Sequence, residues 1–232
     1  MFFGLDPISI FITLGTSLVG MILSSRLKSK FQHYSQIRLL NGKSGKEVAE
    51  AMLRYHNITD VQVVSVDGFL SDHYNPVNKT VNLSPEVYEG RHIAAAAVAA
   101  HECGHAVQHA TAYSMLQLRS AIVPVVNFAS MGLQYVMAIA FMTINTMPAI
   151  MLVTIILFAA TTVFSLITLP VEFDASKRAK EWLNQSYMAM GEENKGVSDA
   201  LWWAAMTYVS AAMSSVIMLA YLILRYVAAT RD

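Results

Sequence analysis

The sequence predicts a mostly α membrane protein, with about four transmembrane helices and a small α+β cytoplasmic domain. Of its 232 residues, 55% are hydrophobic and only 14% are charged, whereas soluble domains have roughly 25% charged residues. Four apolar runs are each long enough to cross a hydrocarbon core as a helix, which takes about 20 residues. Any one run could instead be a buried core helix, but four of them leave too little polar sequence to cover them.

The predicted spans divide the chain into membrane and polar segments. We expect transmembrane helices at residues 5–23, at two places within 121–169 (Ala121–Phe141 and Pro148–Leu169), and at 204–224, with polar segments at 24–120 and 170–203. The first run is preceded by no basic residue and followed by no small-residue cleavage signature, so it is interpreted as a retained anchor. Trp182, Trp202 and Trp203 are expected at membrane interfaces.

The distribution of Lys and Arg predicts the orientation in the cell membrane. Six basic residues lie within 24–46, after the first span, and Lys177, Arg178 and Lys180 follow the third span. Under the positive-inside rule, both polar segments are therefore cytoplasmic and both termini lie outside. Arg225 and Arg231 weakly oppose this orientation.

Charge and cysteine content limit the partners. The net charge is zero, so the sequence offers no basic face for nucleic acid, which we exclude as a partner. Cys103 is the single cysteine and cannot form an intramolecular disulfide, which is compatible with a reducing compartment.

The segment 24–120 has the pattern of a small α+β domain. Ser44–Tyr55 is predicted to be an amphipathic helix, with Ser44 as N-cap and Glu47 completing a capping box. Val61–Val66 and Thr80–Leu83 are β-rich runs that predict a small sheet or hairpin, and the proline in the intervening Asp72–Pro76 argues for a loop there.

A helix that carries a charged motif follows. Ser84 and Pro85 resemble a helix start, Gly90 predicts a break, and Arg91–Gln117 contains no proline and has an Ala-rich centre, which predicts one long helix.

His101-Glu102-Cys103-Gly104-His105 is an H-E-x-x-H motif inside that helix. Residues i and i+4 share a helix face, so both imidazoles can reach one Zn²⁺, and Glu102 can take a proton from the metal's water. The alternative is a helix with solvated histidines. The apolar flank Ala94–Ala100 disfavours it, because two histidines and a carboxylate would be costly there without a metal.

A catalytic zinc normally has three protein ligands, so a third must come from elsewhere. The metzincin pattern fails at Thr111, and His109 extends the i, i+4 series around three turns that cannot easily surround one ion. Glu172 is the better candidate, because it follows the third span and the hairpin of spans two and three returns it to the side of His105. The alternative for Glu172 is an acid that merely flanks a span. Asp174 is expected to orient a ligand histidine.

At this point the sequence resembles a known family. The motif HECGH followed by LPVEFDASKRA resembles the bacterial membrane-bound neutral zinc metallopeptidases of the YugP type. The similarity extends over nearly the whole chain, through RLKSK after the first span, SDHYNP, KTVNLS and LRSAIVP.

The resemblance implies one zinc per chain on His101, His105 and Glu172, with Glu102 as general base in a zincin-like, gluzincin-type domain. It implies an endopeptidase that acts on protein or peptide substrates, membrane proteins among them. Glu172-x-x-x-Ser176 is more distantly similar to the E-x-x-x-D element of the CAAX-processing and heat-shock membrane zinc proteases, from which Ser176 departs.

The sequence leaves some features of the site open. A second electrophile for the tetrahedral oxyanion has several candidates, namely His109, Tyr113, Arg178, His73 and Tyr208. Thr80–Leu83 is hypothesised to pair with an extended substrate. The competing interpretations are a non-peptidase zinc-binding membrane protein or regulator, and a scaffold or transporter, although the spans contain almost no ionisable residues.

Overall fold

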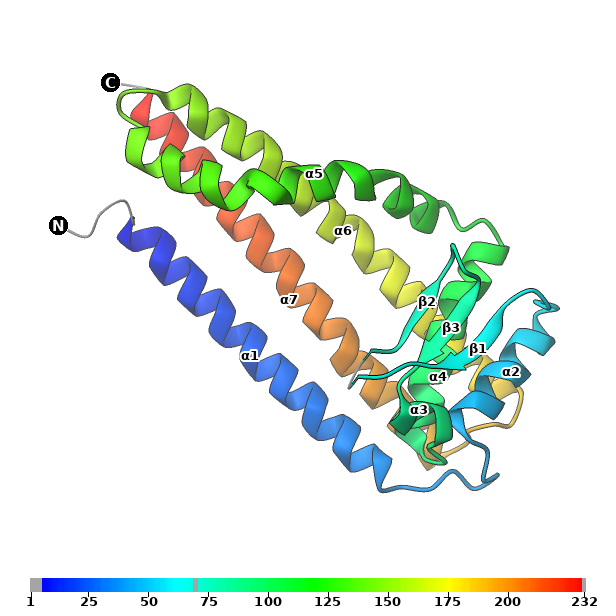
Figure 1. Cartoon of the computed structure of the whole chain (residues 1–232). Helices are drawn as coiled ribbons and strands as arrows, with labels where there is room; N and C mark the ends of the chain where they lie inside the picture. The colour runs from blue at the N-terminus through cyan, green and yellow to red at the C-terminus, as the bar shows by residue number, and fades with distance from the viewer. Residues whose placement is uncertain (1–5, 69–70, 231–232) are drawn as a thin grey trace. The chain divides into compact units, whose positions relative to one another are not determined.

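The structure, a computed structural model, describes residues 6–68 and 71–230. It consists of helices and one three-stranded sheet (Figure 1). The elements in chain order are α1 (Pro7–Ser35), α2 (Gly45–Tyr55), β1 (Gln62–Ser65), β2 (His73–Asn75), β3 (Thr80–Leu83), α3 (Pro85–Glu89), α4 (Ile93–Ala110), α5 (Ser114–Thr143), α6 (Pro148–Gln185) and α7 (Glu192–Ala229).

Within the described residues, four helices are long and apolar enough to cross a membrane: α1, α5, α6 and α7. The predicted fold class, a mostly α membrane protein with a small α+β part, is confirmed. Leu5, where the first span is predicted to begin, lies outside the described residues.

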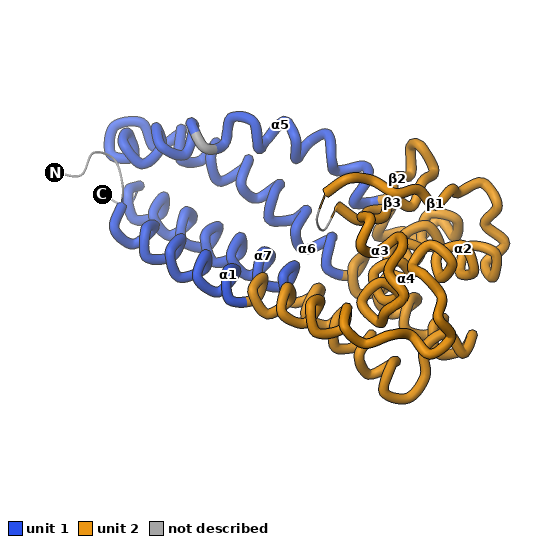
Figure 2. The backbone as a smooth tube through the Cα atoms, turned by 60° about the horizontal axis from the view of Figure 1, so that its bottom comes forward, with its two compact units in different colours: residues 1–22, 118–169, 207–232 blue, residues 23–117, 170–206 orange. Residues whose placement is uncertain are grey.

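The chain divides into two compact units (Figure 2). Unit 1 comprises Met1–Ile22, Leu118–Leu169 and Thr207–Asp232, and unit 2 comprises Leu23–Gln117 and Pro170–Met206. Unit 1 is made of the apolar parts of the long helices and has a small core in which α5, α6 and α7 pack around Met151 and Leu222. Unit 2 contains the sheet, α2, α3 and α4, together with the polar ends of α1, α6 and α7.

Helix α2 forms where its sequence predicts it. The Ser44 hydroxyl accepts a hydrogen bond from the backbone N–H of Glu47, and the Glu47 carboxylate accepts one from the backbone N–H of Ser44, which completes the predicted capping box. Val48, Ala49 and Met52 on its inner face are fully buried.

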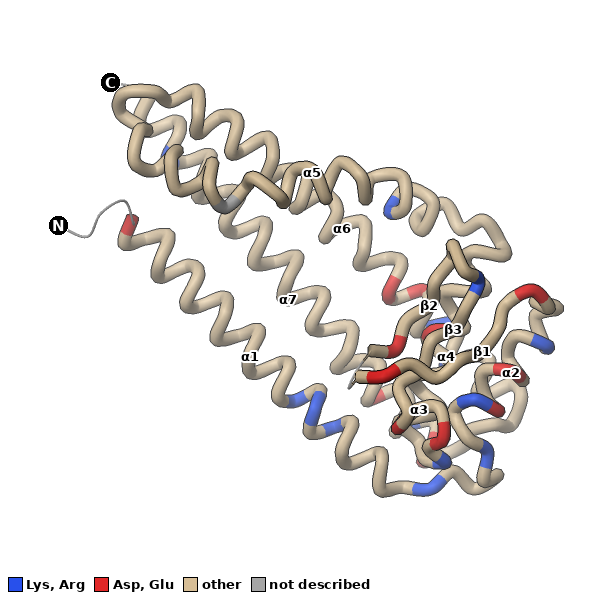
Figure 3. The backbone as a smooth tube through the Cα atoms, viewed as in Figure 1, with Lys and Arg blue, Asp and Glu red and all other residues tan. Residues whose placement is uncertain are grey.

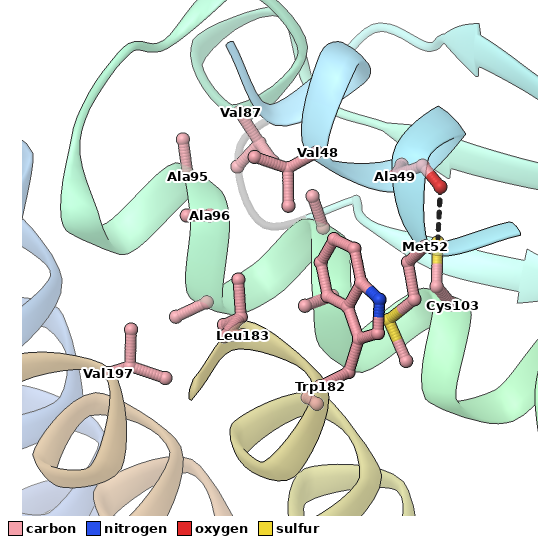
Figure 4. Packing of buried hydrophobic residues seen from close by; sticks show 14 of the residues in the cluster. Val48, Ala49, Met52, Val87, Ala95, Ala96, Cys103, Trp182, Leu183 and Val197 are labelled. Atoms are coloured by element: carbon pink, nitrogen blue, oxygen red, sulfur yellow. Dashed lines mark hydrogen bonds between the residues drawn. The ribbon is translucent and has the colours of Figure 1, made fainter. Parts of the chain in front are cut away.

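The core of unit 2 forms where α2, α4 and α6 meet (Figure 4). The small side chains of Ala94–Ala97 on α4 are buried and allow a close approach of the neighbouring elements. Trp182 of α6 lies in this core with 3% of its surface exposed. The predicted interfacial position of Trp182 is therefore wrong. Trp202 is 51% exposed, and its interfacial position stays a prediction.

The sheet has the strand order β1-β3-β2, with β3 parallel to β1 and antiparallel to β2. Two predictions are wrong here. The strand β2 (His73–Asn75) lies where a loop is predicted, and Pro76 follows its last residue and so removes no ladder hydrogen bond. The hypothesis that Thr80–Leu83 pairs with a substrate is also wrong, because this strand is paired on both sides and has no free edge. The edge strand on the side of the motif is β2.

The motif helix α4 is shorter than predicted. The helix start at Ser84-Pro85 and the break at Gly90 are confirmed. Helix α4 ends at Ala110, and Ala112 has a φ of 51°, a left-handed conformation that turns the chain into α5. The backbone N–H of Tyr113 donates to the carbonyl of Gln108 at 2.9 Å, which closes the helix end.

Candidate metal centre

Helices α4 and α6 bring the three predicted ligands together within unit 2. His101 and His105 lie one turn apart on α4, with ring centroids 4.9 Å apart. Nε2 of His101 lies 3.3 Å, and Nε2 of His105 3.6 Å, from the same Oε2 atom of Glu172 on α6. One candidate donor atom from each of the three residues therefore lies within 4.8 Å of the others.

The close approach of α4 to α6 depends on Gly104. A Cβ atom at this position would lie 2.6 Å from the carbonyl oxygen of Ala175 and 3.0 Å from its Cα. Both atoms belong to the backbone of α6 and cannot move aside alone. The glycine inside the motif therefore allows the helix that carries Glu172 to lie directly against the helix that carries the histidines.

The centre is almost closed to solvent and contains an ionised carboxylate. The Glu172 side chain is 3% exposed, whereas those of His101 and His105 are 13% and 11% exposed. Burial alone would raise the pKa of the Glu172 carboxyl, but the two imidazoles outweigh it and hold that pKa below its usual range. Burial would lower the pKa of His105, yet the carboxylates of Glu172 and Glu102 raise it. The carboxylate is thus ionised and faces the two ring nitrogens.

The other ring nitrogen of each histidine has a partner. Nδ1 of His101 lies 3.1 Å from the Ser176 hydroxyl, and Nδ1 of His105 lies 3.0 Å from Oε1 of Gln108. These contacts hold the rings so that both Nε2 atoms point at Glu172. Partners of this kind orient metal-binding histidines in many proteins.

The predicted base, Glu102, is 9% exposed and lies beside the edge of the sheet. Its Oε2 accepts a hydrogen bond of 3.1 Å from the backbone N–H of Tyr74 in β2. The Tyr74 hydroxyl in turn lies 2.8 Å from Nδ1 of His109. The edge strand therefore fixes the carboxylate next to the first histidine.

The donor set fits a zinc ion. Two imidazole nitrogens and one carboxylate oxygen are the ligands that catalytic zinc sites combine with an open fourth position. An ionised carboxylate that is almost fully buried also calls for a compensating positive charge. The residual exposure of the two histidines leaves the centre accessible on their side.

The remaining candidates have contacts of their own. Asp174 accepts hydrogen bonds from Gln108 and Arg178, so its predicted role in orienting a ligand histidine would act through Gln108, whose Oε1 lies 3.0 Å from Nδ1 of His105. Arg178 lies over the ring of Tyr113, 5.8 Å from its centroid, and Nδ1 of His73 lies 2.7 Å from the carbonyl of Ser71. Tyr208 belongs to unit 1.

Three contact residues are not found by the sequence analysis. Gln108 follows His105 by three residues on α4, so the i, i+3 spacing on a helix is the signal that could reveal it. Ser176 stands where the distantly similar E-x-x-x-D element has Asp, and it contacts His101 through its hydroxyl. Tyr74 has no local signal, because the sheet brings it to Glu102 from 28 residues away.

Four apolar helices and a buried cluster of two histidines and one glutamate define a class: a membrane protein with a candidate zinc centre built on an H-E-x-x-H helix. Comparison with known proteins agrees with this class. The family described as "Putative neutral zinc metallopeptidase" matches residues 9–227, and the chain belongs to this family.

A Bacillus subtilis (strain 168) protein described as "Putative membrane protease YugP" is 43% identical over 206 residues, which is 89% of this chain and 91% of that protein. No solved structure matches the chain. Together with the four apolar helices, the relative supports a location in the membrane.

Proposed function

We propose that this protein is a zinc-dependent integral-membrane endopeptidase. His101, His105 and Glu172 would hold one zinc ion per chain, and Glu102 would act as general base. The observation that carries the proposal is the convergence of two imidazole nitrogens on one oxygen of a buried carboxylate, at 3.3 and 3.6 Å.

When bound, zinc would polarise a scissile carbonyl and acidify a water molecule. Glu102 would take the proton of that water and later deliver it to the leaving amine. The backbone N–H of Tyr74 holds Oε2 of Glu102, so the carboxylate needs little reorganisation before it accepts the proton. The candidates for the second electrophile are His109, Tyr113, Arg178, His73 and Tyr208.

The substrates would be proteins or peptides, membrane proteins among them, and the catalytic residues would face the cytoplasm. The orientation is supported by basic residues such as Arg26 and Lys28, which follow the apolar part of α1 (Figure 3). The description of the B. subtilis relative as a "Putative membrane protease" supports the proposal of a protease.

The alternative is a non-peptidase zinc-binding membrane protein or regulator. A structural zinc site is normally closed by four protein ligands. Only three candidate ligands converge among the described residues here, and a carboxylate held by a backbone N–H lies beside the first of them. This arrangement favours an enzyme.

The substitution Glu102→Gln tests the proposal. The amide keeps the size of the side chain but cannot accept the proton, so we expect about one zinc per chain in both proteins and a loss of proteolysis of at least about 100-fold in the variant. Zinc is measured by metal analysis of the purified protein, and proteolysis with a fluorescent peptide library. The exposed Glu89→Gln is the matched control and should keep both properties. A parent protein without zinc, or a zinc-loaded Glu102→Gln variant with full activity, would refute the proposal.

A further inference from the structure

We propose that Gln108 is a positioning residue: it fixes the proton of His105 on Nδ1 and thereby keeps Nε2 available as a metal ligand. The inference rests on the proposed function, because it concerns the same metal centre. It is carried by four hydrogen bonds that link Arg178, Asp174, Gln108, the carbonyl of Val171 and His105. The chemistry of the partners forces the direction of each bond.

The amide of Gln108 can point only one way. Its Nε2 lies 2.7 Å from the carbonyl oxygen of Val171 and 2.8 Å from Oδ2 of Asp174. A carbonyl oxygen has no proton to donate, and Asp174 is a carboxylate paired with Nε of Arg178 at 2.6 Å. The reverse orientation would place Oε1 of Gln108 against two oxygen acceptors. The amide nitrogen must therefore face Val171 and Asp174.

The orientation of the amide determines the tautomer of His105. Oε1 of Gln108, which only accepts hydrogen bonds, lies 3.0 Å from Nδ1 of His105. Nδ1 must therefore carry the proton. In the neutral imidazole the lone pair then lies on Nε2, the atom that faces Glu172 and that a metal ion requires.

Burial makes this arrangement rigid. Gln108 is fully buried, so water cannot replace any of its partners. Its bond to the carbonyl of Val171 also reaches the residue before Glu172. One side chain on α4 thus orients the second histidine and ties α4 to the backbone beside the third ligand.

His101 differs in this respect. Its Nδ1 faces the Ser176 hydroxyl, which can donate or accept a hydrogen bond. Ser176 can therefore adjust to either tautomer of His101, whereas Gln108 permits only one tautomer of His105. The contacts of His101 and His105 therefore differ in the tautomers that they permit, and substitutions can test this difference.

Two substitutions of Gln108 in the full-length protein in detergent test the inference. Gln108→Met keeps the length of the side chain but removes the acceptor for Nδ1–H. Gln108→Glu retains an acceptor for Nδ1–H, although it places a second carboxylate beside Asp174. The zinc dissociation constant is measured by competition with a chromophoric chelator, and the thermal unfolding of the zinc-free protein is measured separately. The exposed Gln117→Met serves as control and should bind zinc as the parent does.

We expect zinc binding to weaken about 10- to 100-fold in Gln108→Met, the range observed when the partner of a ligand histidine is lost. In Gln108→Glu we expect binding within about threefold of the parent, because a charged acceptor holds Nδ1–H at least as well. The zinc-free Gln108→Glu protein should nevertheless unfold at a lower temperature than the zinc-free Gln108→Met protein. A merely structural role would give zinc affinities in the same order as the unfolding temperatures.

Parent-like zinc binding in Gln108→Met, or a tenfold or greater loss in Gln108→Glu, would overturn the inference. If Gln108→Met does not fold, the result for Gln108→Glu decides alone. A parent that binds no zinc would overturn the proposed function and this inference with it. A parent that binds zinc but cleaves no peptide would refute the proposed function, while the predicted order of zinc affinities would still support the role of Gln108.

Discussion

At the scale of single residues, the two histidines differ in how tightly their rings are defined. Gln108 accepts from Nδ1 of His105 inside a fully buried network, whereas Ser176 offers His101 a hydroxyl that can rotate. Loss of the Ser176 hydroxyl removes one hydrogen bond to His101. Unlike a change at Gln108, it does not disturb a buried amide. The two positions should therefore respond to substitution by different amounts.

Ser176→Ala should weaken zinc binding by about fivefold, the equivalent of one ordinary hydrogen bond of about 1 kcal/mol. The chelator competition used for Gln108 measures it, and the exposed Ser29→Ala on α1 is the control. A loss in Ser176→Ala that exceeds the loss in Gln108→Met would contradict the assignment of the stricter role to Gln108.

The sequence predicts residues whose role follows from their spacing along the chain. It does not predict residues that reach the site only through the tertiary fold. The i, i+4 spacing places His101 and His105 on one face, and the predicted hairpin of spans two and three brings Glu172 to the same side. The structure brings these three residues together. Tyr74 contacts Glu102 through its backbone N–H, a group that every residue except proline has. Its side chain therefore gives no signal, and only the position of β2 reveals the contact.

At the scale of elements, helix α6 contains both the third predicted span and Glu172. The third span is predicted to end at Leu169, just before Pro170, and α6 continues past this residue to Gln185 with the proline inside it. Proline lacks the backbone N–H that would bond to the carbonyl four residues earlier, yet helices at a membrane boundary tolerate this loss. Glu172 therefore lies on the same helix as the third predicted span, three residues after Leu169.

Two of the wrong predictions about elements have local causes. Residues 91–117 contain no proline and few poor helix formers, so propensity alone gives no reason to end α4 at Ala110. The left-handed φ of 51° at Ala112 is held by backbone hydrogen bonds at the helix end. Likewise, β2 has only three residues, and its pairing with β3 outweighs the loop signal of Pro76.

Gly104→Ala should displace α6 from α4. Alanine favours an isolated helix over glycine by about 1 kcal/mol. The new Cβ, however, would lie 2.6 Å from a backbone oxygen of Ala175, and overpacking of this kind costs about 1–3 kcal/mol. We expect a lower unfolding temperature together with zinc binding weakened at least tenfold, because Glu172 moves with α6.

A glycine in open surroundings is the control for Gly104→Ala. A Cβ at Gly20 of α1 would meet no atom within 4 Å, so Gly20→Ala should leave both properties unchanged or raise the unfolding temperature slightly. Unfolding is followed by circular dichroism and zinc by chelator competition. Parent-like zinc binding in Gly104→Ala would show that the contact between α4 and Ala175 does not position Glu172.

At the scale of the whole molecule, the metal centre is assembled from two distant parts of the sequence. Unit 2 takes its histidines from Leu23–Gln117 and its glutamate from Pro170–Met206, and the residues between these segments belong to unit 1. Two predicted membrane crossings between them would return the chain to the same side. Counting spans therefore allows the sequence to predict the third ligand, although no local pattern connects residue 172 with residue 105.

Labelling of introduced cysteines tests the predicted orientation. The native Cys103 is buried, its Sγ faces the carbonyl of Ala49 at 3.5 Å, and burial raises the pKa of its thiol, so it should stay unreactive in the folded protein. The parent can therefore serve as an unlabelled background. Asn145 lies between α5 and α6, Asn184 lies near the end of α6, and both are exposed.

With a membrane-impermeant maleimide, Asn145→Cys should be labelled in intact cells, and Asn184→Cys only after the cells are permeabilised. The reason is that the Lys and Arg residues after the first and third predicted spans are expected to hold the polar segments on the cytoplasmic side. The opposite pattern would place the metal centre outside the cell. Labelling of both variants in intact cells would mean that residues 145 and 184 share one side, which a single crossing by α6 between them forbids. That result would remove the hairpin from which the role of Glu172 was predicted.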